Sequence, residues 1–389
     1  MNVIERFLKY VTFDTASSEN STTFPSTDKQ LVFADFLVDE LKSVGVTDAV
    51  MDKNGYVYGH IPASDGCGNA AAVGLIAHMD TSPAVSGANV KPRIIVFDGK
   101  NAPMTDSKYI GNELIVSDGT TLLCADDKAG VAEIVSACEK ITADKNLKHG
   151  KICICFTPDE EIGNGADRFD FERFGADYAY TVDGGELGGI EYENFFAAAV
   201  KLKVGGVNTH PGSAKNKMRN ALIYLNEFVN MLPAEQTPAH TEGREGFYHI
   251  CGMRGDETSA QLEMLVRDFE RDGFEARKRF VLSITDFLNS KYGDGTFCAE
   301  ITDSYYNMRE VIEKHMEIVA RAENAMRKNG VEPVISAIRG GTDGARLSFE
   351  GLPCPDISTG GMNFHSIYES IPVEALKKMT DIIIGIVSE

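Results

Sequence analysis

The sequence lacks an apolar run close to the roughly 20 residues that a membrane-spanning helix needs. Its first residues, Met-Asn-Val-Ile-Glu-Arg, lack the basic segment followed by an apolar one that marks a secretory signal. Positive charge is also scarce, because 38 lysines and arginines stand against 58 aspartates and glutamates and give a formal net charge of −20. Such a charge repels phosphate backbones and anionic membrane surfaces. We therefore expect a cytoplasmic protein that binds neither nucleic acid nor membranes.

The eight cysteines lack the closely paired CxxC spacing of a zinc ribbon. Cys153 and Cys155 lie two residues apart in a strand-like run, which places both side chains on one face. Buried cysteines of this kind act as small apolar residues. We expect reduced thiols that serve in packing.

The overall composition is that of a globular protein, because 43% of the 389 residues are apolar and 25% are charged. A chain of this length can bury a sizeable core in about two domains. Short apolar runs at 71–77, 151–156 and 178–182 suit strands that are buried on both faces. Helical patterns at 28–44 and 128–141 alternate with them. This alternation predicts an α/β domain with a mostly parallel sheet covered by helices.

The pattern changes after about residue 194. The predicted elements then follow the β-α-β-β-α-β order of a ferredoxin-like unit: 195–204, 214–232, 246–253, 258–269, 271–289 and 296–302. A helix near 307–328, a strand at 332–338 and a helix at 373–387 resume the α/β pattern. We therefore predict an α/β domain in two parts, 1–194 and 307–389, interrupted by an inserted α+β domain at 195–306.

Acidic and histidine side chains follow several predicted strands, whose carboxyl ends face the ligand crevice in an open α/β sheet. At strand spacing His78 and Asp80 point to the same side, so the carboxylate can orient the imidazole toward a metal. Glu160 and Glu161 are adjacent and therefore diverge. One can bind a metal while the other acts as a general base.

Three further segments add to this set. Asp127 has the position of a helix N-cap, which leaves Asp126 available as a ligand. Asp183 precedes Gly-Gly at a strand end, and His365 lies in a loop before the last helix. Each of these residues alone is equally explained as a turn residue. Together the two histidines and the acids supply the N and O donors of a zinc site or a two-metal hydrolase centre.

Seven segments carry a resemblance to a known family: His78-Met79-Asp80, Ala125-Asp126-Asp127-Lys128, Pro158-Asp159-Glu160-Glu161-Ile162-Gly163, Val182-Asp183-Gly184-Gly185, Asn208-Thr209-His210-Pro211-Gly212, Val266-Arg267-Asp268-Phe269 and Ile338-Arg339-Gly340-Gly341-Thr342-Asp343-Gly344. In this order and over nearly the whole chain, they resemble the tripeptide aminopeptidases of the di-zinc exopeptidase family. The resemblance implies a zinc-peptidase α/β domain of the phosphorylase/hydrolase-like type, with the ferredoxin-like domain inserted as a lid.

The resemblance also implies a ligand set for two zinc ions per subunit, with cobalt or manganese as possible substitutes. Asp126 would bridge the ions, His78 and Asp183 would complete one site, and Glu161 and His365 would complete the other. Glu160 would be the general base for a water molecule shared by the ions, and Asp80 would orient His78.

Three residues outside this centre are implied in substrate binding. His210, on the lid, would help to stabilise the oxyanion, while Arg267 and Arg339 would contact the substrate. Alternatives come from the local sequence. His210 precedes Pro211 and suits a turn, and Arg267 can pair with a neighbouring acid in its strand.

The resemblance therefore predicts an enzyme that releases the N-terminal residue from small peptides, above all tripeptides, and that forms a homodimer. Two alternatives stay open. One is a related di-zinc amidohydrolase acting on dipeptides, N-acyl amino acids or C-terminal residues. The other is an inactive module that binds metal or peptide, against which Glu160 argues because binding needs only the ligands.

Overall fold

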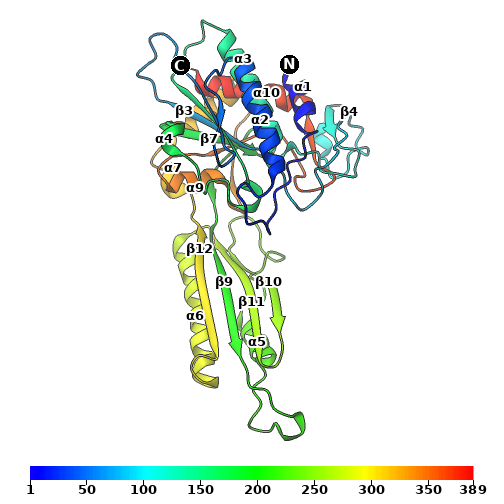
Figure 1. Ribbon diagram of the computed structural model, residues 1–389, viewed down its shortest axis with the longest axis vertical. Helices are drawn as coiled ribbons and strands as arrows, with labels where there is room; N and C mark the ends of the chain where they lie inside the picture. Colours follow the sequence, from blue (N-terminus) through cyan, green and yellow to red (C-terminus); the bar gives the residue numbers. More distant parts are fainter. Residues whose placement is uncertain (389) are drawn as a thin grey trace. The chain divides into compact units, whose positions relative to one another are not determined.

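The computed structural model describes residues 1–388, and its chain divides into two compact units (Figure 1). The first unit comprises Met1–Tyr192, Met308–Ser336 and Thr342–Glu389. The second comprises Glu193–Asn307 and the short segment Ala337–Gly341. The domain limits given above for 1–194, 195–306 and 307–389 stay a prediction.

The first unit is built on an eight-stranded sheet with the order β1-β2-β6-β3-β7-β14-β8-β13. Its strands are β1 (Val50–Met51), β2 (Val57–Ile61), β3 (Val73–His78), β6 (Ile152–Thr157), β7 (Tyr178–Gly184), β8 (Gly189–Asn194), β13 (Val334–Ile338) and β14 (Asp356–Ser358). The four central strands β6, β3, β7 and β14 are parallel. Every residue of β3 and β6 is buried, which explains their continuous apolar sequences. The predicted α/β class is confirmed.

Eight helices belong to the described part of this unit: α1 (Val3–Tyr10), α2 (Asp28–Ser43), α3 (Ala125–Ala143), α4 (Phe171–Phe174), α7 (Arg309–Ile312), α8 (Met316–Lys328), α9 (Asp343–Phe349) and α10 (Val373–Val387). The nearly all-buried α3 contacts β3, β7, α1 and α10. Cys153 and Cys155 are fully buried in one cluster with residues of α4 and α9, so their packing role is confirmed. None of the helices within residues 1–388 is long and apolar enough to cross a membrane.

Several local expectations differ from the structure. The helix predicted at 307–328 is two helices, α7 and α8, because the chain makes a turn after Ile312. A small antiparallel sheet with the order β15-β5-β4 was not predicted, and its strands are β4 (Arg93–Val96), β5 (Glu113–Val116) and β15 (Ser370–Pro372). The short apolar stretches of this sheet carry little periodicity, so the pairing depends on partners that are far away in the sequence.

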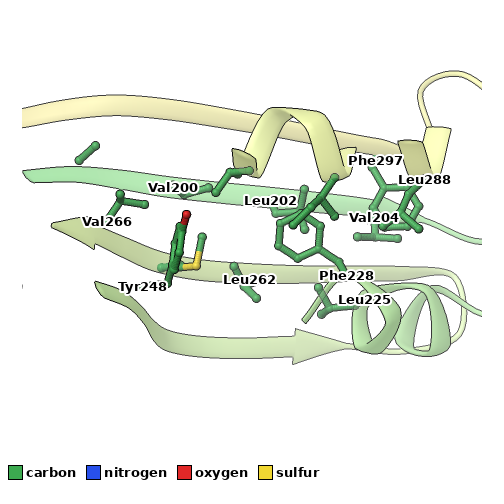
Figure 2. Packing of buried hydrophobic residues seen from close by; sticks show 14 of the residues in the cluster. Val200, Leu202, Val204, Leu225, Phe228, Tyr248, Leu262, Val266, Leu288 and Phe297 are labelled. Carbon is green, nitrogen blue, oxygen red and sulfur yellow. The ribbon is translucent and has the colours of Figure 1, made fainter. Parts of the chain in front are cut away.

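The second unit has the predicted ferredoxin-like order. Its elements are β9 (Phe196–Gly205), α5 (Ala221–Met231), β10 (Phe247–Gly255), β11 (Ser259–Asp268), α6 (Arg271–Tyr292) and β12 (Phe297–Tyr305). The strands form an antiparallel sheet with the order β10-β11-β9-β12. Figure 2 shows Val200, Leu202 and Val204 of β9 packed with Leu262 and Val266 of β11 and with side chains of both helices.

The helix α5 begins later than its apolar pattern predicts. Its N-cap is Asn220, whose side chain accepts hydrogen bonds from the backbone N–H groups of Leu222 and Ile223. The preceding residues Pro211–Ser213 form a separate 3-10 turn, η3. The first residue of that turn is a proline, which suits a helix start but not a helix interior.

The close packing of β3 yields a prediction about stability. A Cβ atom added at Gly74 would lie 2.6 Å from ring atoms of Phe174 and 2.7 Å from the Cβ of Ala179. Overpacking of this kind costs about 1–3 kcal/mol. We expect Gly74→Ala to lower the free energy of unfolding by about that amount in urea titrations. Gly68→Ala is the control, because a Cβ there meets no atom within 4 Å. Equal stability of the two variants would contradict this packing.

Candidate metal centre and active site

The predicted site residues of the first unit gather where the central strands end. His78 is the last residue of β3 and pairs in register with Thr157, the last residue of the parallel strand β6. Glu160 and Glu161 open the short 3-10 turn η2 (Glu160–Ile162) just after β6. Asp183 lies near the end of β7, the other parallel neighbour of β3. Parallel strands bring their carboxyl ends to one edge, so these side chains meet there.

The two carboxylate oxygens of Asp126 face different histidines. His78 Nε2 lies 2.8 Å from Asp126 Oδ1 and 3.3 Å from Asp183 Oδ1. His365 Nε2 lies 3.1 Å from Asp126 Oδ2 and 2.9 Å from Glu161 Oε2. The five candidate ligands therefore form two groups that share Asp126.

Asp127 is a competing ligand candidate that the sequence did not suggest. Two groups can bring their ligand atoms within 4.8 Å of one another: His78, Asp127 and Asp183, and His78, Asp126 and Glu161. However, the Asp127 carboxylate accepts hydrogen bonds from the backbone N–H of Gly130 at 3.1 Å and of His78 at 3.0 Å. The first of these is the capping bond expected for Asp127. Because both oxygens of Asp127 are engaged, Asp126 is the better metal donor.

Asp80 links His78 to the Glu160 segment. His78 Nδ1 lies 3.1 Å from the backbone carbonyl of Asp80 and 3.4 Å from its Oδ1. Both groups only accept, so Nδ1 carries a proton and Nε2 of the neutral ring can bind a metal. The Asp80 carboxylate also accepts from the backbone N–H of Glu160 at 3.0 Å and of Glu161 at 3.2 Å. Asp80 therefore fixes the position of the histidine and of both glutamates.

The electrostatics of this cluster favour a bound cation. Burial raises the pKa of Glu160 well above its usual range and raises that of Asp183 to about 6. Burial alone would raise the pKa of Asp126. Hydrogen bonds and charge interactions with His365 and His78 together have the larger effect and lower this pKa. Glu161 Oε1 is buried and has no hydrogen-bond partner. The donors are nitrogen and oxygen only, which zinc, cobalt and manganese accept. The residues therefore fit a metal centre.

A cavity of about 480 Å³ adjoins the second ligand group. It is lined by Glu161 and His365 together with small or polar residues of two loops: Ser17, Ser18, Glu19, Asn20, Ser82, Pro83 and Ala84. The second group of candidate ligands therefore borders a cavity of the first unit.

His210 belongs to the second unit and is the N-cap of the 3-10 turn η3. Its Nδ1 accepts a hydrogen bond of 3.1 Å from the backbone N–H of Gly212. A neutral imidazole whose Nδ1 accepts carries its proton on Nε2. His210 therefore has the turn role considered above and also presents a ring N–H donor.

Arg267 and Arg339 lie together in the second unit. Arg267 Nη1 donates to the backbone carbonyl of Arg339 at 2.9 Å, and its Nε is buried without a partner. The neighbouring acid Asp268 pairs with Arg277 at 2.7 Å, not with Arg267. Arg339 donates to the backbone carbonyls of Gly243 and Glu245, so much of its hydrogen-bonding capacity is used within the unit.

Two buried acids near the ligands were missed in the sequence. Glu369 accepts a 3.0 Å hydrogen bond from the backbone N–H of Asp126, and Asp356 accepts one of 3.3 Å from that of Asp183. The one signal in the sequence is an acid beside a short apolar strand, as in Pro-Asp-Ile-Ser and Glu-Ser-Ile-Pro. That signal is weak, because acids at strand ends are common in loops.

The α/β fold and the clustered histidines and carboxylates are those of a metal-dependent hydrolase. Residues 74–389 match the model of peptidase family M20/M25/M40, and the chain belongs to this family. The peptidase T of Halothermothrix orenii is 50% identical over 400 residues, which cover 99% of this chain and 98% of that protein.

Solved structures share the fold. The aminopeptidase PepT of Bacillus cereus has a TM-score of 0.80 and 24% identity, covering 99% of this chain and 97% of that one. A dinuclear metal binding peptidase of the M20 family from Bacillus subtilis has a TM-score of 0.67 and 14% identity, covering 99% and 96%. The expected family and fold are confirmed, and the chain is a hydrolase, a metallopeptidase with aminopeptidase activity.

Proposed function

We propose that this metallo-aminopeptidase holds two zinc ions per subunit and releases the N-terminal residue of unblocked tripeptides. The observation that carries the proposal is the division of the candidate ligands into two groups that share Asp126. The 50% identity to a peptidase T and the family's dinuclear member from Bacillus subtilis support it. The homodimer and the cytoplasmic location stay predictions.

In this proposal Asp126 would contribute to both metal sites, His78 and Asp183 would complete one of them, and Glu161 and His365 would complete the other. When bound, such ions polarise the scissile carbonyl and lower the pKa of water. Cobalt and manganese bind the same N and O donors and are expected to substitute.

Glu160 acts as the general base. Its burial raises its pKa, which makes the carboxylate a stronger base than one in water. Its backbone is held by Asp80, so the side chain starts from a fixed position. Glu160 takes a proton from the attacking water and passes it to the leaving amine.

Residues of the second unit are proposed to recognise the rest of the substrate. The Nε2–H of His210 donates to the developing oxyanion. Arg267, whose Nε is unpartnered, and Arg339 bind the C-terminal carboxylate, which guanidinium groups recognise well. The free amine of the peptide is a cation near neutral pH and suits the carboxylate-rich centre.

The first test addresses the base. We expect Glu160→Gln to keep the metal content of the wild type while turnover falls by at least about two orders of magnitude, as for loss of a general base. Metal analysis and rates on Met-Gly-Gly check this. Glu172→Gln, at an exposed position in α4, is the matched control and should change neither. Unchanged turnover of Glu160→Gln at full metal content would rule out this role.

The second test addresses the shared ligand. Asp126→Ala should lose both metals, whereas His365→Ala should mainly lose one, because only the aspartate contacts both ligand groups. Metal content per chain after dialysis measures the difference. Equal losses in both variants would show that Asp126 does not bridge two ions.

The third test addresses the substrate. Met-Gly-Gly should yield free methionine, and its N-acetylated form should not react, because acetylation removes the cationic amine. A hexapeptide should react more slowly if the arginines set the distance from the metals to the carboxylate. Chromatography of the products measures which residue is released from each peptide and at what rate. Release of acetyl-methionine at the rate of methionine, or equal rates for both lengths, would favour an N-acyl hydrolase or a broad dipeptidase instead.

A further inference from the structure

Glu369 is a buried acid with an unusual set of partners. It lies between His365 and α10, and only 1% of its surface is exposed. Its Oε2 accepts hydrogen bonds of 2.8 Å from the backbone N–H groups of both Leu123 and Cys124. Its Oε1 accepts one of 3.0 Å from the backbone N–H of Asp126. One carboxylate therefore binds three of the four N–H groups in the segment 123–126.

This segment depends on outside contacts for its shape. Cys124 has φ 65° and ψ 35°, a left-handed conformation that residues other than glycine rarely adopt. Asp126 also has non-helical backbone angles, although it lies in the first turn of α3. Because the segment does not follow a regular helix, its amides need acceptors other than helix carbonyls, and Glu369 supplies them.

The candidate ligand Asp183 has similar support from one buried acid. Asp356 accepts from the backbone N–H of Asp183, and both acids lie on adjacent parallel strands. The two supported residues, Asp126 and Asp183, differ in the number of histidines that they contact. Asp126 contacts His78 with one oxygen and His365 with the other, whereas Asp183 contacts His78 alone of these two histidines.

We propose that Glu369 is a positioning residue of the metal centre, which holds the segment 123–126 so that each oxygen of Asp126 faces its own ligand group. This role rests on the proposed two-metal function. This role predicts different effects on metal binding for Glu369 and Asp356. Loss of the Glu369 hydrogen bonds weakens the binding of both ions, whereas loss of the Asp356 bond weakens only the one held by Asp183.

Zinc titration of the chelator-treated full chain tests this role. In Glu369→Gln the side chain keeps its size, but its amide NH₂ cannot accept, so at least one backbone N–H loses its partner. We expect both zinc dissociation constants to rise at least about tenfold. Asp356→Asn should raise one of them and leave the other within about twofold. Glu374→Gln, at an exposed position in the first turn of α10, is the control and should change neither.

A third variant separates position from charge. Glu369→Asp keeps the negative charge but withdraws the carboxylate by one methylene, so a positioning role predicts weaker binding of both ions here too. The same variant replaces Glu369→Gln if the latter fails to fold, as judged by circular dichroism. Wild-type zinc binding by Glu369→Asp, or loss of one ion alone in either variant, would overturn the proposal. A wild-type protein that binds fewer than two zinc ions would overturn the two-metal function and this role with it.

Discussion

Carboxylates crowd one buried edge of the central sheet, and the arrangement of the centre follows from how their charges are accommodated. Asp126, Glu161 and Asp183 face one another across two histidines. Behind them, Asp80, Asp127, Asp356 and Glu369 are buried as well. The outer acids accept hydrogen bonds from backbone N–H groups, so their carboxyl oxygens have partners within the protein. Within residues 1–388 the inner acids lack such backbone donors and contact the two histidines instead, an arrangement that suits a bound cation.

Each outer acid also connects a candidate ligand to another part of the chain. Asp127 binds the backbone of His78, Asp80 binds that of Glu161, and Glu369 binds that of Asp126. Ligand geometry in metal sites depends strongly on such supporting contacts. In this fold the support reaches the main chain of the candidate ligands His78, Glu161 and Asp126 and not only their side chains.

Local patterns in the sequence were sufficient to predict the central strands β3, β6 and β7, the order of the inserted unit and the residues that follow those central strands. The helix at 373–387 and the β-α-β-β-α-β order are reproduced because apolar periodicity acts over a few residues. Glu369 was missed because its partner Leu123 is 246 residues away in the sequence. The contact of Arg267 with Arg339 spans 72 residues and was hidden for the same reason. Long-range hydrogen bonds of buried polar groups have no local signature.

The division of the chain into two units limits how the second unit can be exchanged between related proteins. The second unit is not one continuous insertion, because Ala337–Gly341 belongs to it as well as Glu193–Asn307. Arg339, in the short segment, donates a hydrogen bond to the backbone carbonyl of Gly243. The backbone carbonyl of Arg339 accepts a hydrogen bond from Arg267 of the long segment. A chimera that takes only Glu193–Asn307 from a relative would pair Arg339 of one protein with the Gly243 and Arg267 positions of the other. An exchange of the second unit must therefore replace both segments together, the long one and the five residues of Ala337–Gly341.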